Sequence, residues 1–143
     1  MKATQISVFL ENKQGRLADV TKVLADNDIN IRALFIADTS DFGILRMIVN
    51  KPGKAVEILK ENQFTVSETD VVAVELEDRP GSLANVLGIL NDNKLNVEYL
   101  YCFLDTERNV AVDIMRLEDT ARAIDVLQNS GVKLLSASDL HEL

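Results

Sequence analysis

Two short segments combine a glycine with charged and amide side chains, and they are the parts of the sequence that could bind a small ligand. They read ENKQGRL at residues 11–17 and EDRPGSL at residues 77–83. An alternating apolar pattern typical of a strand precedes each segment, and apolar residues at helical spacing follow it. Each segment therefore predicts a tight turn into the first N–H groups of a helix, which attract a carboxylate or a phosphate.

Residues of the second turn have both a structural and a ligand-binding interpretation. Pro80 suits the first turn of the helix, where its missing N–H removes no hydrogen bond. Asp78 can act near the helix cap, and Gly81 lets the backbone approach a bound molecule. A tight turn with a capped helix and no ligand explains the same residues, so both interpretations stay open.

The two turns belong to an internal repeat. A shift of 66 residues places Gly15 on Gly81, and the match runs without a gap from Val8 on Val74 to Leu34 on Leu100. The pattern predicts strands at 3–11, 29–37, 42–50 and 64–69 in the first copy, and at 71–77, 96–104, 109–117 and 132–138 in the second. It predicts helices at 17–27, 55–62, 80–92 and 119–129, and hairpin turns at 38–41 and 105–108.

The element order predicts an α+β protein made of two ferredoxin-like βαββαβ modules, at residues 1–70 and 71–143. Right-handed crossovers place both helices of a module on one face of an antiparallel sheet. An exposed sheet edge must be covered in a small protein. Because no Gly- or Ser-rich linker separates the copies, we expect their sheets to join into one eight-stranded sheet.

Composition restricts the partners. The chain of 143 residues has a formal net charge of −8, which argues against nucleic acid and anionic membrane surfaces. No apolar run approaches the ~18 residues of a membrane span, and no signal sequence opens the chain. The single cysteine, Cys102, is expected to pack as a small apolar residue and fits a reducing cytoplasm. Because modules of about 70 residues bury little surface alone, we expect a homodimer.

No catalytic constellation is visible in the sequence. His141 and Cys102 are the only residues of their types, and no glycine-rich phosphate loop or paired metal-ligand spacing occurs. An acylphosphatase-like enzyme would need a phosphate loop after the first strand, where Glu77 and Asp78 oppose an anion. We therefore expect no catalytic residue, no metal and no cofactor.

The motif as a whole resembles the ACT domain, a βαββαβ module that binds small ligands, usually amino acids. The resemblance lies in a strand ending Asp-Arg-Pro-Gly-x-Leu, a helix, and a strand that opens Asn96-Val97. The first copy resembles it too, with Asn30-Ile31 and with Gln14 in place of the usual proline. The resemblance covers the chain as a tandem pair. It implies an amino acid bound between two modules, where the turn of one module faces the second strand of its partner.

The resemblance also implies which residues touch the ligand. Helix N–H groups would hold the ligand carboxylate, and side-chain oxygens would accept from its ammonium group. The candidate residues are Asn12, Gln14, Gly15, Arg16, Leu17, Asn30, Ile31, Asp78, Arg79, Pro80, Gly81, Ser82, Leu83, Asn96 and Val97. Because Gln14 relaxes the first turn, we expect the second turn to bind more tightly, and Gly81→Val to abolish binding while leaving the fold mostly intact.

These observations favour a non-catalytic regulatory protein that binds an amino acid. Ligand bound across an interface would stabilise one arrangement of the modules over another. One alternative is a regulatory subunit that controls an enzyme of amino-acid metabolism through protein contact, in the manner of the small subunit of acetolactate synthase. A second alternative is a dimerisation module without a ligand.

Overall fold

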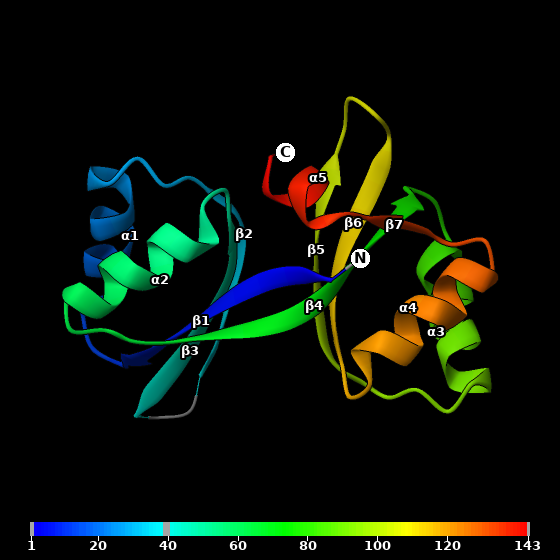
Figure 1. Ribbon diagram of the computed structural model, residues 1–143, viewed down its shortest axis with the longest axis horizontal. Helices are drawn as coiled ribbons and strands as arrows, with labels where there is room; N and C mark the ends of the chain where they lie inside the picture. Colours follow the sequence, from blue (N-terminus) through cyan, green and yellow to red (C-terminus); the bar gives the residue numbers. More distant parts are fainter. Residues whose placement is uncertain (1, 39–40, 143) are drawn as a thin grey trace. The chain divides into compact units, whose positions relative to one another are not determined.

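The computed structural model describes residues 2–38 and 41–142 (Figure 1). Its strands are β1 (Ala3–Glu11), β2 (Ile31–Asp38), β3 (Phe42–Val49), β4 (Thr65–Glu77), β5 (Val97–Asp105), β6 (Val110–Leu117) and β7 (Lys133–Leu135). Its helices are α1 (Arg16–Asp26), α2 (Pro52–Glu61), α3 (Ser82–Asp92), α4 (Thr120–Asn129) and α5 (Ala137–His141). The predicted α+β class and the antiparallel pairing are confirmed.

The sheet contains seven strands in the described residues rather than the predicted eight. The strand order is β2-β3-β1-β4-β6-β5, and β7 pairs with β4 off this path. The difference arises because the last strand of the first copy and the first strand of the second are one strand, β4, of 13 residues. No glycine or proline interrupts the chain around Asp70, so the backbone stays extended across the predicted boundary.

The chain divides into two compact units, and within β4 the boundary between them falls between Thr69 and Asp70. In the unit that contains the first copy, α1 and α2 lie on one side of the strands (Figure 1). The helices bury alternate residues of β1 and β3, as the period-2 pattern predicts. This core comprises Ile6, Val8, Leu10, Val20, Leu24, Ile29, Leu45, Met47, Val49, Ala55, Ile58, Leu59 and Phe64.

The unit that contains the second copy has the same internal design. Helices α3 and α4 cover one side of its strands (Figure 1). Its core comprises Val72, Val74, Leu76, Val86, Leu90, Leu95, Met115, Leu117, Ala123, Ile124, Leu127 and Leu134. The apolar stripe of each helix therefore packs against the sheet. This packing fixes the position of the turn before α1 or α3 relative to the strands of its own unit.

The sequence predicts hairpin turns at 38–41 and 105–108. The turn predicted at 38–41 includes residues 39 and 40, which lie outside the described residues. The turn predicted at 105–108 occupies 106–109 instead. There the Asp105 carboxylate accepts from the N–H of Arg108 at 3.2 Å. Asn109 closes the turn with a positive φ of 56°.

The C-terminal segment departs from the prediction of a strand at 132–138. Strand β7 ends at Leu135, and α5 begins two residues later. The helix starts because Ser136 and Asp139 cap each other: the N–H of Asp139 donates to Ser136 Oγ at 3.1 Å, and the N–H of Ser136 donates to Asp139 Oδ2 at 3.4 Å. His141, the last residue of α5, is buried.

Candidate functional site

The two glycine turns have the same backbone. Gly15 has φ 91° and ψ −18°, and Gly81 has φ 92° and ψ −16°. Both glycines are helix N-caps in the left-handed region, which other residues adopt only under strain. The matching dihedral angles mean that the predicted relaxation of the first turn by Gln14 does not occur in the backbone.

Main-chain hydrogen bonds hold each turn. In the second turn the N–H of Arg79 donates to the carbonyl of Glu77 at 2.9 Å, and the N–H of Asn85 donates to that of Gly81 at 2.9 Å. The first turn has the equivalent bonds, from Lys13 to Glu11 at 2.8 Å and from Asp19 to Gly15 at 2.9 Å. Neither helix has a side-chain cap. The first N–H of each helix donates within the turn at 3.4 Å, from Arg16 to the carbonyl of Lys13 and from Ser82 to that of Arg79. The next two N–H groups of each helix lack intrahelical acceptors and are left to a ligand or to solvent.

Two predicted roles in the second turn are wrong. Pro80 lies before the N-cap rather than in the first turn of the helix, because α3 begins at Ser82. Asp78 does not cap α3, because the cap position belongs to Gly81, which has no side chain. Instead the N–H of Asp78 donates to the carbonyl of Asn109 at 3.3 Å, which ties the turn to the β5–β6 hairpin.

Charged side chains flank both glycines. Lys13 Nζ lies 2.6 Å from Glu11 Oε2, and Arg79 Nε lies 2.5 Å from Glu77 Oε2. The hydrogen bond and the charge of Lys13 hold the pKa of the Glu11 carboxyl below its usual value. Each turn thus presents a balanced ion pair beside the helix start.

The first turn opens onto a hollow of about 290 Å³ beside the edge strand β2. Leu10, Ile36 and Gly43 supply its apolar side. Its polar side consists of Glu11, which pairs with Lys13, together with Asn12 and Arg16. Leu17, which also lines it, is 40% exposed. The arrangement can hold a small molecule that has one anionic end and an apolar part.

The corresponding side of the second turn is polar. In the second copy Cys102 on β5 lies opposite Asp113 on β6. The equivalent pair in the first copy is Ile36 on β2 and Leu45 on β3. A thiol and a carboxyl thus replace two aliphatic side chains. Asp113 is 3% exposed, and burial raises the pKa of its carboxyl. Burial, followed by the charge and hydrogen bond of Asp113, raises the pKa of the Cys102 thiol. Cys102 is exposed rather than packed as a small apolar residue, which corrects the prediction.

Sequence reasoning did not single out Asp113, the buried carboxyl of β6. The signal was available, because it is the single acidic residue inside the apolar strand Val110–Leu117. A buried ionisable side chain within a strand is uncommon unless it serves a site or a specific partner.

The asparagines that open the second strand of each copy do not join the glycine turns within a copy. Asn30 and Asn96 follow the far ends of α1 and α3, each 11 residues or about 16 Å long. The N–H of Asn30 donates to Asn50 Oδ1 at 2.9 Å, and its carbonyl accepts from the N–H of Asn50 at 3.1 Å. Ile31 and Val97 pack at the margins of the two cores. A structural role at the strand start accounts for all four residues.

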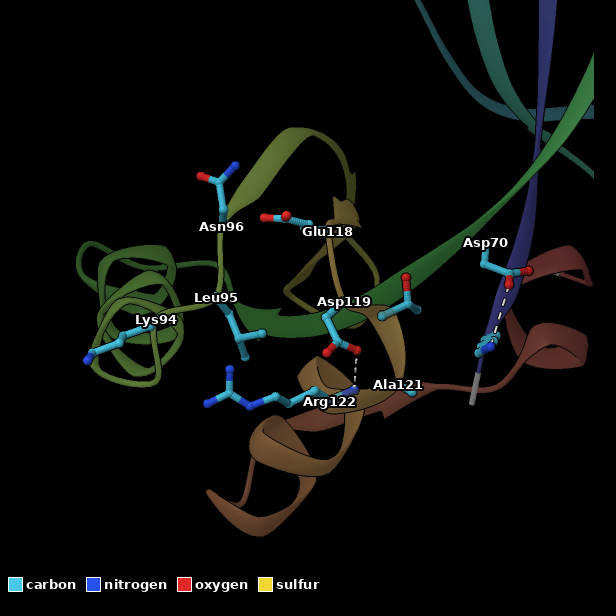
Figure 2. Close-up of a pocket in the computed structure, with 10 residues that line it drawn as sticks. Asp70, Lys94, Leu95, Asn96, Glu118, Asp119, Ala121 and Arg122 are labelled. Carbon is cyan, nitrogen blue, oxygen red and sulfur yellow. Dashed lines mark hydrogen bonds and ion pairs between the residues drawn. The ribbon is translucent and has the colours of Figure 1, made fainter.

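Figure 2 shows the surroundings of Asn96, a polar hollow of about 630 Å³ that also includes Lys94 and Arg122. Its acidic residue Asp119 caps α4, where the carboxylate accepts from the N–H of Arg122 at 3.1 Å (Figure 2). Lys2 and Asp70 form an ion pair at 3.6 Å on its far side. The side chains of Asp119, Lys2 and Asp70 are thus engaged within the fold.

Residues 2–38 and 41–142 contain neither a cluster of metal ligands nor a helix that could span a membrane. No group of three or more His, Cys, Asp and Glu side chains there could hold a metal ion. No helix in those ranges is both long and apolar enough to span a membrane.

A match to a protein-family model identifies the family of this chain. A family model described as an ACT domain pair matches residues 1–143. The chain belongs to this family. No curated protein matches it.

Solved structures show the same ACT pair fold. Protein BT0572 from Bacteroides thetaiotaomicron is 49% identical over 100% of this chain and 98% of its own, with a TM-score of 0.96. The ligand-free regulatory subunit of aspartate kinase from Thermus thermophilus is 16% identical over 89% of this chain and 91% of its own, with a TM-score of 0.63. The corresponding Thermus flavus subunit is 15% identical over 92% and 94%, with a TM-score of 0.63. At these identities the two subunits show the fold of an ACT pair.

Proposed function

We propose that this ACT pair is a non-catalytic regulatory protein of the cytoplasm that binds a free amino acid at its glycine turns. The observation that carries the proposal is the pair of left-handed glycine N-caps without side-chain caps. Each leaves helix N–H groups for a carboxylate. The flanking carboxylates Glu11 and Glu77 can attract an ammonium group.

The apolar rim of each turn supports a site shared between modules. Leu17 and Leu83 are 40% and 36% exposed at the helix starts. Leu34 and Ile36 are also exposed, on the edge strand β2. Strands β2 and β5 stand at the two ends of the strand order in the described residues, so each is an edge strand. We propose a homodimer in which a second chain covers such an edge and closes the ligand site.

A thermal-shift screen of the purified chain against the twenty amino acids tests the function. A ligand at about one hundred times its dissociation constant adds roughly 2.7 kcal/mol to the free energy of unfolding. The midpoint then rises by several degrees. Nucleotides and divalent metals serve as controls. If no amino acid moves the midpoint or gives heat in calorimetry, the sensor function is wrong.

A regulatory subunit that contacts a target enzyme is the second candidate, and one observation favours it. Phe9 and Phe42 lie 5.1 Å apart between ring centroids, and they are 48% and 45% exposed. Both project from the face of the β1–β3 strands opposite the buried core residues Leu10 and Leu45. Paired exposed aromatic rings are typical anchors of protein interfaces. Retention of an amino-acid-metabolism enzyme by the wild type, but not by Phe9→Ser, would support this role.

A further inference from the structure

A hollow of about 370 Å³ lies beside the second glycine turn, on the β7 side of α3. We call it the Ser82 hollow. Its lining includes Leu76, Ser82, Val86, Gly131, Val132 and Lys133. It is separate from the Cys102–Asp113 pair, which lies on strands β5 and β6 to the other side of β4.

Ser82 is the unexplained polar group of this hollow. It is 8% exposed, and its Oγ has no hydrogen-bond partner in the part of the chain that the structure describes. Leaving a buried hydroxyl unpaired costs about 1–3 kcal/mol, so such groups need an explanation. The N–H of Ser82 is already engaged, because it donates to the carbonyl of Arg79 at 3.4 Å. The Ser82 hydroxyl is therefore the group left to donate to an acceptor on a ligand.

The first copy fills the equivalent space with its own side chain. Arg16 stands in the position of Ser82, and Phe64 stands in the position of Val132, because Phe64 and Val132 donate equivalent N–H bonds to Leu59 and Leu127 at 3.0 Å. The guanidinium carbon of Arg16 lies 4.8 Å from the centre of the Phe64 ring. The second copy has a hydroxyl and a smaller apolar residue instead, which leaves the space open.

The charges around the Ser82 hollow match a zwitterion. Lys133 Nζ lies 2.7 Å from Glu75 Oε2, and Arg79 pairs with Glu77. All four residues line the hollow, so it carries two cations and two carboxylates. A multiply charged anion would meet Glu75 and Glu77, whereas a small molecule with one carboxylate and one ammonium group meets partners for both.

We propose that the Ser82 hollow is an intramolecular ligand site of the second module for a small zwitterionic carboxylate. The carboxylate accepts from Ser82 Oγ and lies near the cations Arg79 and Lys133, which line the hollow. The ammonium group donates to Glu77, because Glu75 already accepts from Arg108 and Lys133. Leu76, Val86 and Val132 contact the apolar part. The ligand class rests on the proposed amino-acid binding, but the location does not, because this site needs no second module.

The test compares Ser82→Arg, which introduces the side chain of the first copy, with the wild type. The probes are the amino acids that shift the wild-type midpoint, with the N-acetyl and amide derivatives of each as charge controls. Calorimetry is expected to show at least a tenfold loss of affinity in Ser82→Arg and a smaller loss in Ser82→Ala. Both derivatives should bind the wild type more weakly than the parent amino acid.

Two further variants separate the explanations. Ala25→Arg adds the same charge at an exposed position of α1, and Asp113→Asn alters the other side of the second turn; both should keep the wild-type affinity. Unchanged affinity in a folded Ser82→Arg overturns the Ser82 hollow and leaves amino-acid binding in place. A loss of affinity in Asp113→Asn alone places the ligand on the β5 side and also overturns the proposal. If no amino acid binds the wild type, both the function and the site fail.

Discussion

Cys102 and Asp113 face each other across β5 and β6, at the positions that Ile36 and Leu45 occupy in the first copy. The pair places an ionisable side chain on the helix-covered face of the sheet beside Val74, a core residue. The two modules therefore share a backbone and differ in the chemistry next to the turn. A buried carboxyl at one position and leucine at the other give the two turns different chemical surroundings.

The first prediction concerns Asp113→Asn. Because burial raises the pKa of this carboxyl in the folded chain, its protonated form stabilises the fold below the unfolded pKa of about 3.9. That stabilisation is lost as the pH rises through the folded pKa. Asp113→Asn should therefore be more stable than the wild type at pH 7, and the difference should vanish near pH 3. Urea unfolding at both pH values measures it. A variant less stable at pH 7 would show that the charged carboxylate has a stabilising partner.

The second prediction concerns the turn glycines. At φ 91–92° an L-residue costs roughly 1–2 kcal/mol, although a Cβ at either glycine would meet nothing within 4 Å. Gly15→Ala and Gly81→Ala should each destabilise by about that amount. Gly53→Ala, inside α2 with no positive φ, should instead stabilise by ~0.5–1 kcal/mol. Gly81→Val therefore strains the turn as well as any site, so it does not test binding cleanly, contrary to the expectation from sequence.

How far the sequence predicts the structure depends on whether the signal is local. The repeat, the helices and the left-handed glycines follow from periodicity and from the one residue type that tolerates positive φ. The continuity of β4 was missed because two strands without a turn between them look like neighbours rather than one element. The Ser136 and Asp139 cap was overlooked although its halves lie only three positions apart, which makes it a local signal. The difference between Ser82 and Arg16 has meaning only when Val132 and Phe64, about 50 residues away along the chain, are placed beside them.

The third prediction concerns Glu75, whose side chain is 9% exposed and contacts both Arg108 at 2.6 Å and Lys133 at 2.7 Å. The hydrogen bond from Lys133, followed by that from Arg108, holds the pKa of this carboxyl below its usual value against the effect of burial. The carboxylate therefore stabilises the fold above its unfolded pKa of about 4.3, and this contribution is lost as the pH falls through the folded pKa.

Glu75→Gln should destabilise the chain by about 1–3 kcal/mol at pH 7 and by little at pH 3, measured by urea unfolding. The matched control is Glu98→Gln, which removes a more exposed ion pair with Arg116 at 3.4 Å and should cost less than about 1 kcal/mol. If the two variants lower the free energy of unfolding equally, the partly buried position of Glu75 does not strengthen its ion pairs.

The last prediction concerns His141, which is buried in the unit that contains the first copy. Its Nδ1 lies 2.7 Å from the carbonyl oxygen of Val49, and because a carbonyl only accepts, Nδ1 carries the proton. Arg32 Nε donates to the carbonyl of His141 at 3.4 Å. His141→Ala leaves the Val49 carbonyl unpaired and opens a cavity, so it should destabilise by about 1–3 kcal/mol in urea unfolding. Glu142→Ala, at the exposed next position, should be neutral. Equal stability of the two variants would mean that the His141 hydrogen bond contributes nothing to folding.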